Sequence, residues 1–352
     1  MTMRRLINLK RVEARRIYLT YAIVIIAYVI CQVMSSTKFL SSSMRGMLVP
    51  ICAYMVMAVS LNLVVGILGE LSLGHAGFMS VGAFSGVAAA ILMQKVIPYA
   101  PARLAIAMII ASIFAAIAGF LIGIPVLRLK GDYLAIVTLA FGEIIKSILN
   151  NFYFGVDAQG LHFSMLTDTT RLLKGGRLII RGPMGISGIQ KISTFPAGFI
   201  LLMIALMIVF NLVNSRSGRA FMAIRDDRIA AESIGLDITK YKMMAFVMSA
   251  ALAGAAGALF AMNYSTIVAN KFDFNTSILI LVFVVLGGQG NMLGGIIAAA
   301  VLTILPEKLR QFSEYRMLLY AIVLIVMMLA TNNAEIKSFL ANLNPFKRKE
   351  AE

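Results

Sequence analysis

The sequence of 352 residues has no tryptophan, two cysteines, two histidines and few charged residues, which make up 14% of the chain. Soluble domains carry roughly 25% charged residues, so this low charge content excludes an ordinary soluble protein. Hydrophobic residues instead make up 60% of the chain. Because tryptophan is missing, tyrosine and phenylalanine must form any aromatic belt at a membrane–water interface.

The chemically reactive residues do not form the clusters that catalysis or metal binding requires. Cys31 and Cys52 lie inside apolar runs without C-x-x-C spacing and are interpreted as packing residues. His75 and His162 do not have the spacing of a metal site. The sequence contains no phosphate-binding G-x-x-x-x-G-K-[ST] motif and no Ser-His-Asp or nucleophile-elbow pattern. We therefore expect a protein that is not an enzyme and that uses no cofactor and no metal.

Apolar runs recur along nearly the whole chain and predict an all-α, polytopic integral membrane protein with about 8–10 transmembrane segments. The net charge of +16 could indicate nucleic-acid binding. However, the basic residues fall between and outside the apolar runs, so we expect them to meet anionic lipid, with no nucleic-acid partner. The expected segments are residues 17–34, 47–67, 69–93, 103–124, 133–149, 199–213, 243–262, 277–286, 293–305 and 316–330.

Two of these segments, residues 277–286 and 293–305, are short and flank the sequence GGQGN, which ends at Asn291. At 1.5 Å per residue each covers about 15–20 Å, less than a hydrocarbon core about 30 Å thick. Short segments interrupted by glycine are typical of broken helices beside a transport path. The alternative is one long tilted helix with a flexible centre.

Polar residues inside the segments are candidates for such a path. The third segment begins with a glycine-rich stretch that holds Ser72 and His75. Polar backbone at the entrance of a span is tolerated where protein covers it or where it lines water, although an ordinary cytoplasmic turn is the alternative. Glu143 in the fifth segment lies one helical turn from Lys146 and can pair with it. This pair is either functional or a lysine that extends to the headgroups.

Small residues repeat at helical spacing in residues 69–93 and 243–262. Such rows give a smooth surface on which another helix can approach closely. Because residues 243–262 carry two rows, we expect this helix to be central and packed on two sides. The residues expected at helix contacts are Gly82, Gly86, Ala250, Gly254, Gly257 and Ala258.

A charged island, residues 215–243, interrupts the apolar pattern. A serine–glycine start and a stop at Gly235 predict one short helix over residues 219–235. A charged helix between two spans must lie at the bilayer surface. There it either rests at the headgroups or is held by a partner protein.

The expected organisation is a cytoplasmic basic tail over residues 1–16, a transmembrane domain over residues 17–331 and a second cytoplasmic basic tail over residues 332–352. The 150–195 loop then lies outside and, because of its length, contains some short structure of its own. Basic residues favour this orientation only weakly, since the 150–195 loop alone contains five of them.

Four stretches resemble the M-type permease of bacterial branched-chain amino acid ABC importers: residues 62–84, 131–151, 182–189 and the charged island. The resemblance covers about residues 61–330. It implies a type II ABC importer permease in the bacterial inner membrane, with a cytoplasmic N-terminus. The implied partners are a homologous second permease, two cytoplasmic ATP-binding subunits and a periplasmic protein that delivers leucine, isoleucine or valine. The chain departs from the family over residues 161–181, where it is longer.

The resemblance also implies a role for the island, because such permeases carry a coupling helix with an E-A-A-x-x-x-G pattern that docks into the ATPase. Ala230, Ala231 and Gly235 match this pattern, whereas Ile229 replaces the glutamate. The charged residues implied to orient the island on the ATPase are Arg219, Arg225, Asp226, Asp227 and Arg228. The implied translocation path includes Ser72, His75, Glu143 and Asn291.

Three other functions are possible for such a chain. An ion-driven secondary transporter needs buried carboxylates in several spans, and only Glu143 qualifies. A related ABC permease for urea, amides or sugars would share the same architecture. An intramembrane enzyme is disfavoured because no paired catalytic set is present.

Overall fold

The computed structural model describes residues 3–37, 41–94, 96–129, 131–157, 160–165 and 176–309, and four isolated positions beyond them. This part of the chain is mostly helical and contains seven helices long and apolar enough to cross a membrane. The prediction of a polytopic helical membrane fold is therefore confirmed. The predicted span over residues 316–330 lies outside the described residues apart from the isolated positions, and the basic tail over residues 332–352 lies wholly outside them.

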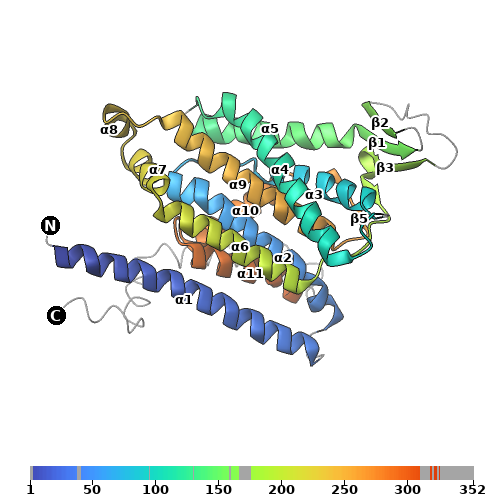
Figure 1. Cartoon of the computed structure of the whole chain (residues 1–352), viewed down its shortest axis with the longest axis horizontal. Helices are drawn as coiled ribbons and strands as arrows, with labels where there is room; N and C mark the ends of the chain where they lie inside the picture. The colour runs from blue at the N-terminus through green and yellow to red at the C-terminus, as the bar shows by residue number, and fades with distance from the viewer. Residues whose placement is uncertain are drawn as a thin grey trace. The chain divides into compact units, whose positions relative to one another are not determined.

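Three mostly buried helices form the centre: α2 (Ser42–Asn62), α3 (His75–Leu92) and α9 (Ile238–Ala261). Beside them lie α4 (Ala100–Val126) and α6 (Phe195–Asn214) (Figure 1), in which most residues are not buried. Apolar side chains that face outward are expected where lipid is the solvent. The first helix, α1 (Met3–Ser36), packs on α6 through stacked rings of Tyr28 and Phe199. It begins at Met3, so the predicted N-terminal tail and the first span form one helix.

Small residues occupy the contacts between α3, α9 and α4. A Cβ added to Gly82 would overlap the backbone of Gly254, and a Cβ on Gly254 would overlap Ala111 and Ala115 of α4. Gly257 lies in the same way against the carbonyl of Met79. The two remaining contacts of this kind are Gly86 against Ala258 and Gly119 against Ala250. Because backbone or an alanine methyl group meets each of these glycines, these positions tolerate no larger side chain.

The 150–195 loop contains a small antiparallel sheet beyond α5 (Asp132–Asn150). The strands are β1 (Phe152–Asp157), β2 (Gly160–Met165) and β3 (Arg177–Arg181), in the order β2-β1-β3. A second pair joins β4 (Ile186–Ser187) to β5 (Thr266–Ile267), and short 3₁₀ turns lie at η2 (Gly182–Met184) and η3 (Ala269–Lys271). The helical fold therefore includes local β-structure at one end of the helices (Figure 1).

The segment expected to be broken forms two helices, α10 (Phe274–Gly287) and α11 (Met292–Lys308). Gly288 and Gly290 in the turn have φ values of +87° and +82°, a backbone region that favours glycine. A Cβ on Gly287 would overlap the backbone of Gly294, so the two helices meet closely at their glycines. This geometry excludes the alternative of one long helix.

We expect Gly254→Leu to destabilise the protein by more than about 3 kcal/mol, because the new side chain has only backbone and Ala115 to displace. Thermal unfolding of the purified protein in detergent would measure the change. Gly46→Leu is the matched control, since nothing lies within 4 Å of a Cβ at Gly46. Equal midpoints for both variants would contradict the close contact of α3, α9 and α4.

Candidate functional site

The charged island forms two helices, α7 (Arg216–Asp226) and α8 (Arg228–Ser233), at the end of the bundle opposite the β1–β3 sheet (Figure 1). The expectation of one helix over residues 219–235 is therefore wrong. The break is at Asp227, whose backbone is extended and whose carboxylate accepts hydrogen bonds from the amides of Ile229 and Ala230. Aspartate at an N-cap satisfies the free amides of a helix start, so it begins a new helix instead of continuing the old one.

The two helices have different surroundings. In α7, Ala220, Phe221 and Ile224 are buried against the membrane-domain helices. In α8, Ile229 is 80% exposed, and Ile234 at the C-cap of α8 is 75% exposed. Large apolar side chains at this exposure, on a polar segment outside the apolar spans, are typical of a surface that a partner covers.

Of the residues implied to contact an ATPase, most lie on the outer surface of the island. Arg219, Asp226, Asp227 and Ala230 are exposed, whereas Ala231 is 3% exposed and faces inward. Gly235 has a φ of +83° with open space around it, so it terminates α8. Arg228 is half-buried.

Arg225 is 40% exposed, yet it also contacts the membrane domain. Its Nη1 donates a hydrogen bond to the carbonyl of Gly66, with 3.1 Å between the atoms. Its aliphatic stem lies so close to Gly69 that a Cβ there would contact it. Its Nε and Nη2 donate to Asp226. Arg225 therefore connects the island to the membrane domain.

Gly66 belongs to a π-helical turn, η1 (Leu63–Leu68), which directly follows α2. A Cβ on Gly66 would overlap the backbone of Gly290 in the turn between α10 and α11. The side-chain oxygen of Asn62 accepts a hydrogen bond of 2.9 Å from the amide of Gly290. Thus α7, η1 and the α10–α11 turn meet at one place, which we call the η1 junction (Asn62, Gly66, Arg225 and Gly290). In the sequence, the η1 junction is marked only by an asparagine inside an apolar run and by the glycines of the α10–α11 turn.

The segment after η1 is held by a second polar contact. The ammonium of Lys242, whose side chain is 2% exposed, pairs with the carboxylate of Glu70. This pair ties the extended chain between η1 and α3 to the first turns of α9. Lys242 lies within the charged island of residues 215–243, but it is buried and does not belong to the island's surface.

His75 and Ser72 are buried where α2, α3 and α9 meet. The Nε2 atom of His75 lies 2.9 Å from the Ser60 hydroxyl and 3.2 Å from the Ser249 hydroxyl. His75 Nδ1 and Ser72 Oγ are buried with no hydrogen-bond partner among the described residues. Buried polar atoms without partners are unusual and mark a place where a further polar group would be stabilised.

The other two residues of the predicted path have capping contacts. Glu143 pairs with Lys146 and also accepts a hydrogen bond of 3.2 Å from the amide of Phe274 at the start of α10. The side chain of Asn291 accepts one of 3.2 Å from the amide of Gly294 at the start of α11. Both therefore satisfy helix N-termini, and neither shares a partner with His75.

A family model described as the branched-chain amino acid transport system / permease component matches residues 43–331. The chain belongs to this permease family. The matched range contains α3, the island, the η1 junction and the broken pair of helices, and the permease is a multi-pass membrane protein.

The permease is similar to the high-affinity branched-chain amino acid transport system permease protein LivM of Salmonella typhimurium, with 36% identity over 291 residues. LivM of Escherichia coli is 36% identical over 287 residues. Each match covers 78% of this chain and 66% of the relative, so the chain spans about two thirds of the length of these relatives. The fructose import permease protein FruG of Bifidobacterium longum is 24% identical over 66% of this chain and 67% of its own length. No solved structure matches the chain.

We expect Lys242→Met to destabilise the permease by about 3 kcal/mol, because Glu70 would lose the partner of a largely buried ion pair. The double variant Glu70→Gln with Lys242→Met should recover most of this loss, since neither charge then remains. Thermal unfolding in detergent tests both. A double variant no more stable than Lys242→Met would contradict the pairing.

Proposed function

We propose that the chain is the permease subunit of an ATP-driven importer of branched-chain amino acids. The identity of 36% with two LivM proteins over 78% of the chain carries this proposal. In it, a second homologous permease completes the translocation path and a periplasmic binding protein delivers the substrate. Two cytoplasmic subunits hydrolyse ATP, and this chain catalyses no reaction. The N-terminus and the island face the cytoplasm of a bacterium, with the chain in the inner membrane.

The island is the surface on which an ATPase acts. Ile229, Ile234 and the exposed Ala230 form an apolar face on α8. Arg219, Asp226 and Arg228 of the same island would supply the polar rim that orients a partner. Because Asp227 caps α8, the segment is already helical before a partner binds, which lowers the entropic cost of docking.

The η1 junction carries motion from the island into the spans. Since Arg225 is bonded to Gly66, a displacement of α7 acts directly on η1. Gly66 in turn lies against Gly290, so the turn between α10 and α11 is displaced too. Within this scheme the island moves as one body with the broken pair of helices, and the cavity shared with the second permease opens alternately to each side.

The docking surface is tested by Ile229→Arg and Ile234→Arg. Each should reduce co-purification of the ATP-binding subunits and lower uptake of labelled leucine more than tenfold, because each places a charge where an apolar contact is required. Met184→Arg, at an exposed apolar residue of the opposite end, is the control for assembly and should leave co-purification of the ATP-binding subunits unchanged. Normal uptake in a variant carrying both island substitutions would refute docking at α8.

The junction is tested by Arg225→Ala. In proteoliposomes the ATP-binding subunits should remain bound and hydrolyse ATP, while leucine uptake per ATP falls about tenfold. A tenfold fall corresponds to the free energy expected for loss of one hydrogen bond from a charged group. Arg216→Ala, at an exposed position of α7, is the control. If Arg225→Ala instead released the ATP-binding subunits, Arg225 would act on the partner and not on η1.

A sugar importer is the second candidate, because FruG covers 66% of this chain at 24% identity. Uptake of labelled leucine, fructose and urea by the same reconstituted complex distinguishes the candidates. Leucine uptake that unlabelled isoleucine and valine inhibit supports the proposed function. Uptake of fructose or urea without leucine would replace it.

A further inference from the structure

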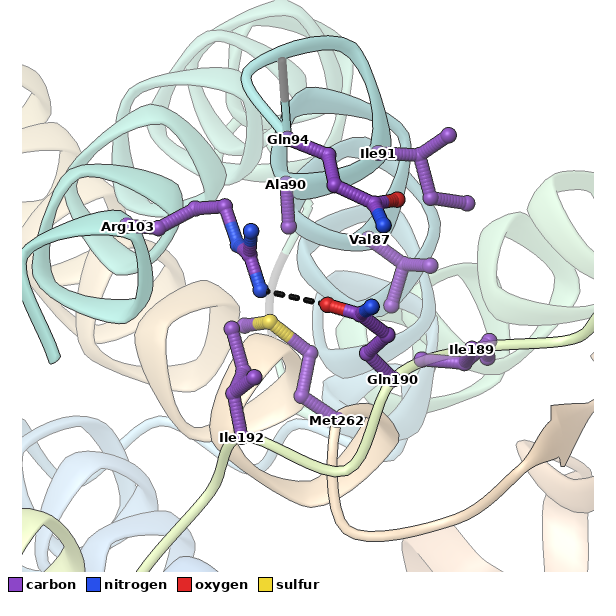
Figure 2. Close-up of a pocket in the computed structure, with 9 residues that line it drawn as sticks. All are labelled: Val87, Ala90, Ile91, Gln94, Arg103, Ile189, Gln190, Ile192 and Met262. Atoms are coloured by element: carbon purple, nitrogen blue, oxygen red, sulfur yellow. Dashed lines mark hydrogen bonds between the residues drawn. The ribbon is translucent and has the colours of Figure 1, made fainter. Parts of the chain in front are cut away.

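A cavity of about 520 Å³ lies at the sheet end of the helices, beside the N-terminus of α4. Its wall comes from the residues after α3, the first turn of α4 and the chain that leads into α6. The lining residues are Gln94, Pro98, Ala100, Arg103, Gln190, Lys191 and Ile192. A smaller apolar pocket adjoins it and shares Arg103 and Gln190, which point toward each other in Figure 2.

Arg103 is 4% exposed, although its guanidinium carries a full charge. Its Nη2 donates to the side-chain oxygen of Gln190 at 2.7 Å, and its Nη1 donates to the carbonyl of Ile97 at 3.5 Å. Both acceptors are neutral, and within the described ranges no carboxylate lies within ion-pair distance of Arg103. Buried charges are normally paired, so the cavity holds an uncompensated positive charge.

Two further features add positive potential. Lys191 is exposed and lines the same cavity. The cavity also faces the N-terminus of α4, a helix of 27 residues, where free amides and the helix dipole favour an anion. None of the described residues that line the cavity is acidic. A zwitterionic amino acid would bring its ammonium beside two cations, so the site favours a group with net negative charge.

The surroundings indicate where this group comes from. Tyr99 at the start of α4 is 68% exposed, and Ile109 and Ile113 farther along α4 are 60% and 52% exposed. An exposed tyrosine above an apolar helix face is typical of the headgroup level of a bilayer. We propose that the cavity binds the phosphate of an anionic phospholipid, in the leaflet at the sheet end.

In this site the guanidinium of Arg103 donates to the phosphate oxygens, and Lys191 neutralises the remaining charge. Basic pockets between transmembrane helices bind anionic headgroups in this way, and planar guanidinium groups suit phosphate oxygens. The lipid holds the chain before α6 against α3 and α4 from outside. This inference concerns lipid retention, so it stands or falls separately from the substrate and the ATPases of the proposed function.

Native mass spectrometry of the purified full chain, titrated with phosphatidylglycerol, tests the site. The wild-type chain should retain one phosphatidylglycerol more tightly than phosphatidylethanolamine. Arg103→Gln should weaken that retention about tenfold or more, because a hydrogen bond from a charged group is lost. Lys271→Gln, at an exposed cation of the same end outside the cavity, is the control and should not change it.

Because Arg103 is buried, Lys191→Glu provides a second variant whose exposed side chain leaves the core unchanged. It too should weaken retention of phosphatidylglycerol, with an unaltered thermal midpoint. Equal affinity for phosphatidylglycerol in the wild-type chain and in both cavity variants would overturn the proposal. Equal binding of phosphatidylethanolamine would do the same. The proposal would also be overturned if a soluble acidic peptide displaced the lipid at a concentration below that of the lipid, because the cavity would then belong to a protein partner.

Discussion

The close approach of α3 and α9 at Gly82 and Gly254 is the contact on which the rest of the structure depends. In a bilayer the lipid is as apolar as the side chains, so helices associate through close packing and hydrogen bonds, not through the hydrophobic effect. Gly254 contacts α3 on one side and α4 on the other, so one glycine sets the spacing of three helices. This spacing buries His75 within reach of Ser60 and Ser249.

The same packing explains why irregular backbone survives at the island end. A π-helical turn and the extended segment after it leave amides and carbonyls that hydrocarbon cannot satisfy. Here Arg225 donates a hydrogen bond to the Gly66 carbonyl, and the Asn62 side chain accepts one from the Gly290 amide. Glu70 pairs with Lys242. In these three contacts, a polar group of the irregular segments is satisfied by a residue of another element. Because those helices share the junction, a change in any one of them reaches the others.

Much of the fold could be predicted from the sequence, because hydrophobic runs and rows of small residues report directly on spans and contacts. The division into α10 and α11 followed from segments too short to cross a bilayer. The break at Asp227 was missed although aspartate favours an N-cap over a helix interior, because the adjacent Asp226 offers the same signal and no glycine or proline marks the position. The direction of Arg225 depends on which face of α7 meets η1, and that is set by residues about 160 positions earlier. The strand pairing of the 150–195 loop likewise gave no local signal.

The weak bias of basic residues between the two sides has a structural explanation. The positive-inside rule applies to lysine and arginine in loops whose side of the membrane is set by their charge. At the sheet end, Arg103 is buried against Gln190, and Lys271 lies over the ring of Tyr264 with 4.3 Å between its nitrogen and the ring centre. These cations are fixed by folded contacts, so they report on local structure and not on orientation. Arg225 and Lys242 at the island end are fixed by folded contacts in the same way, which contributes to the weak bias between the two ends.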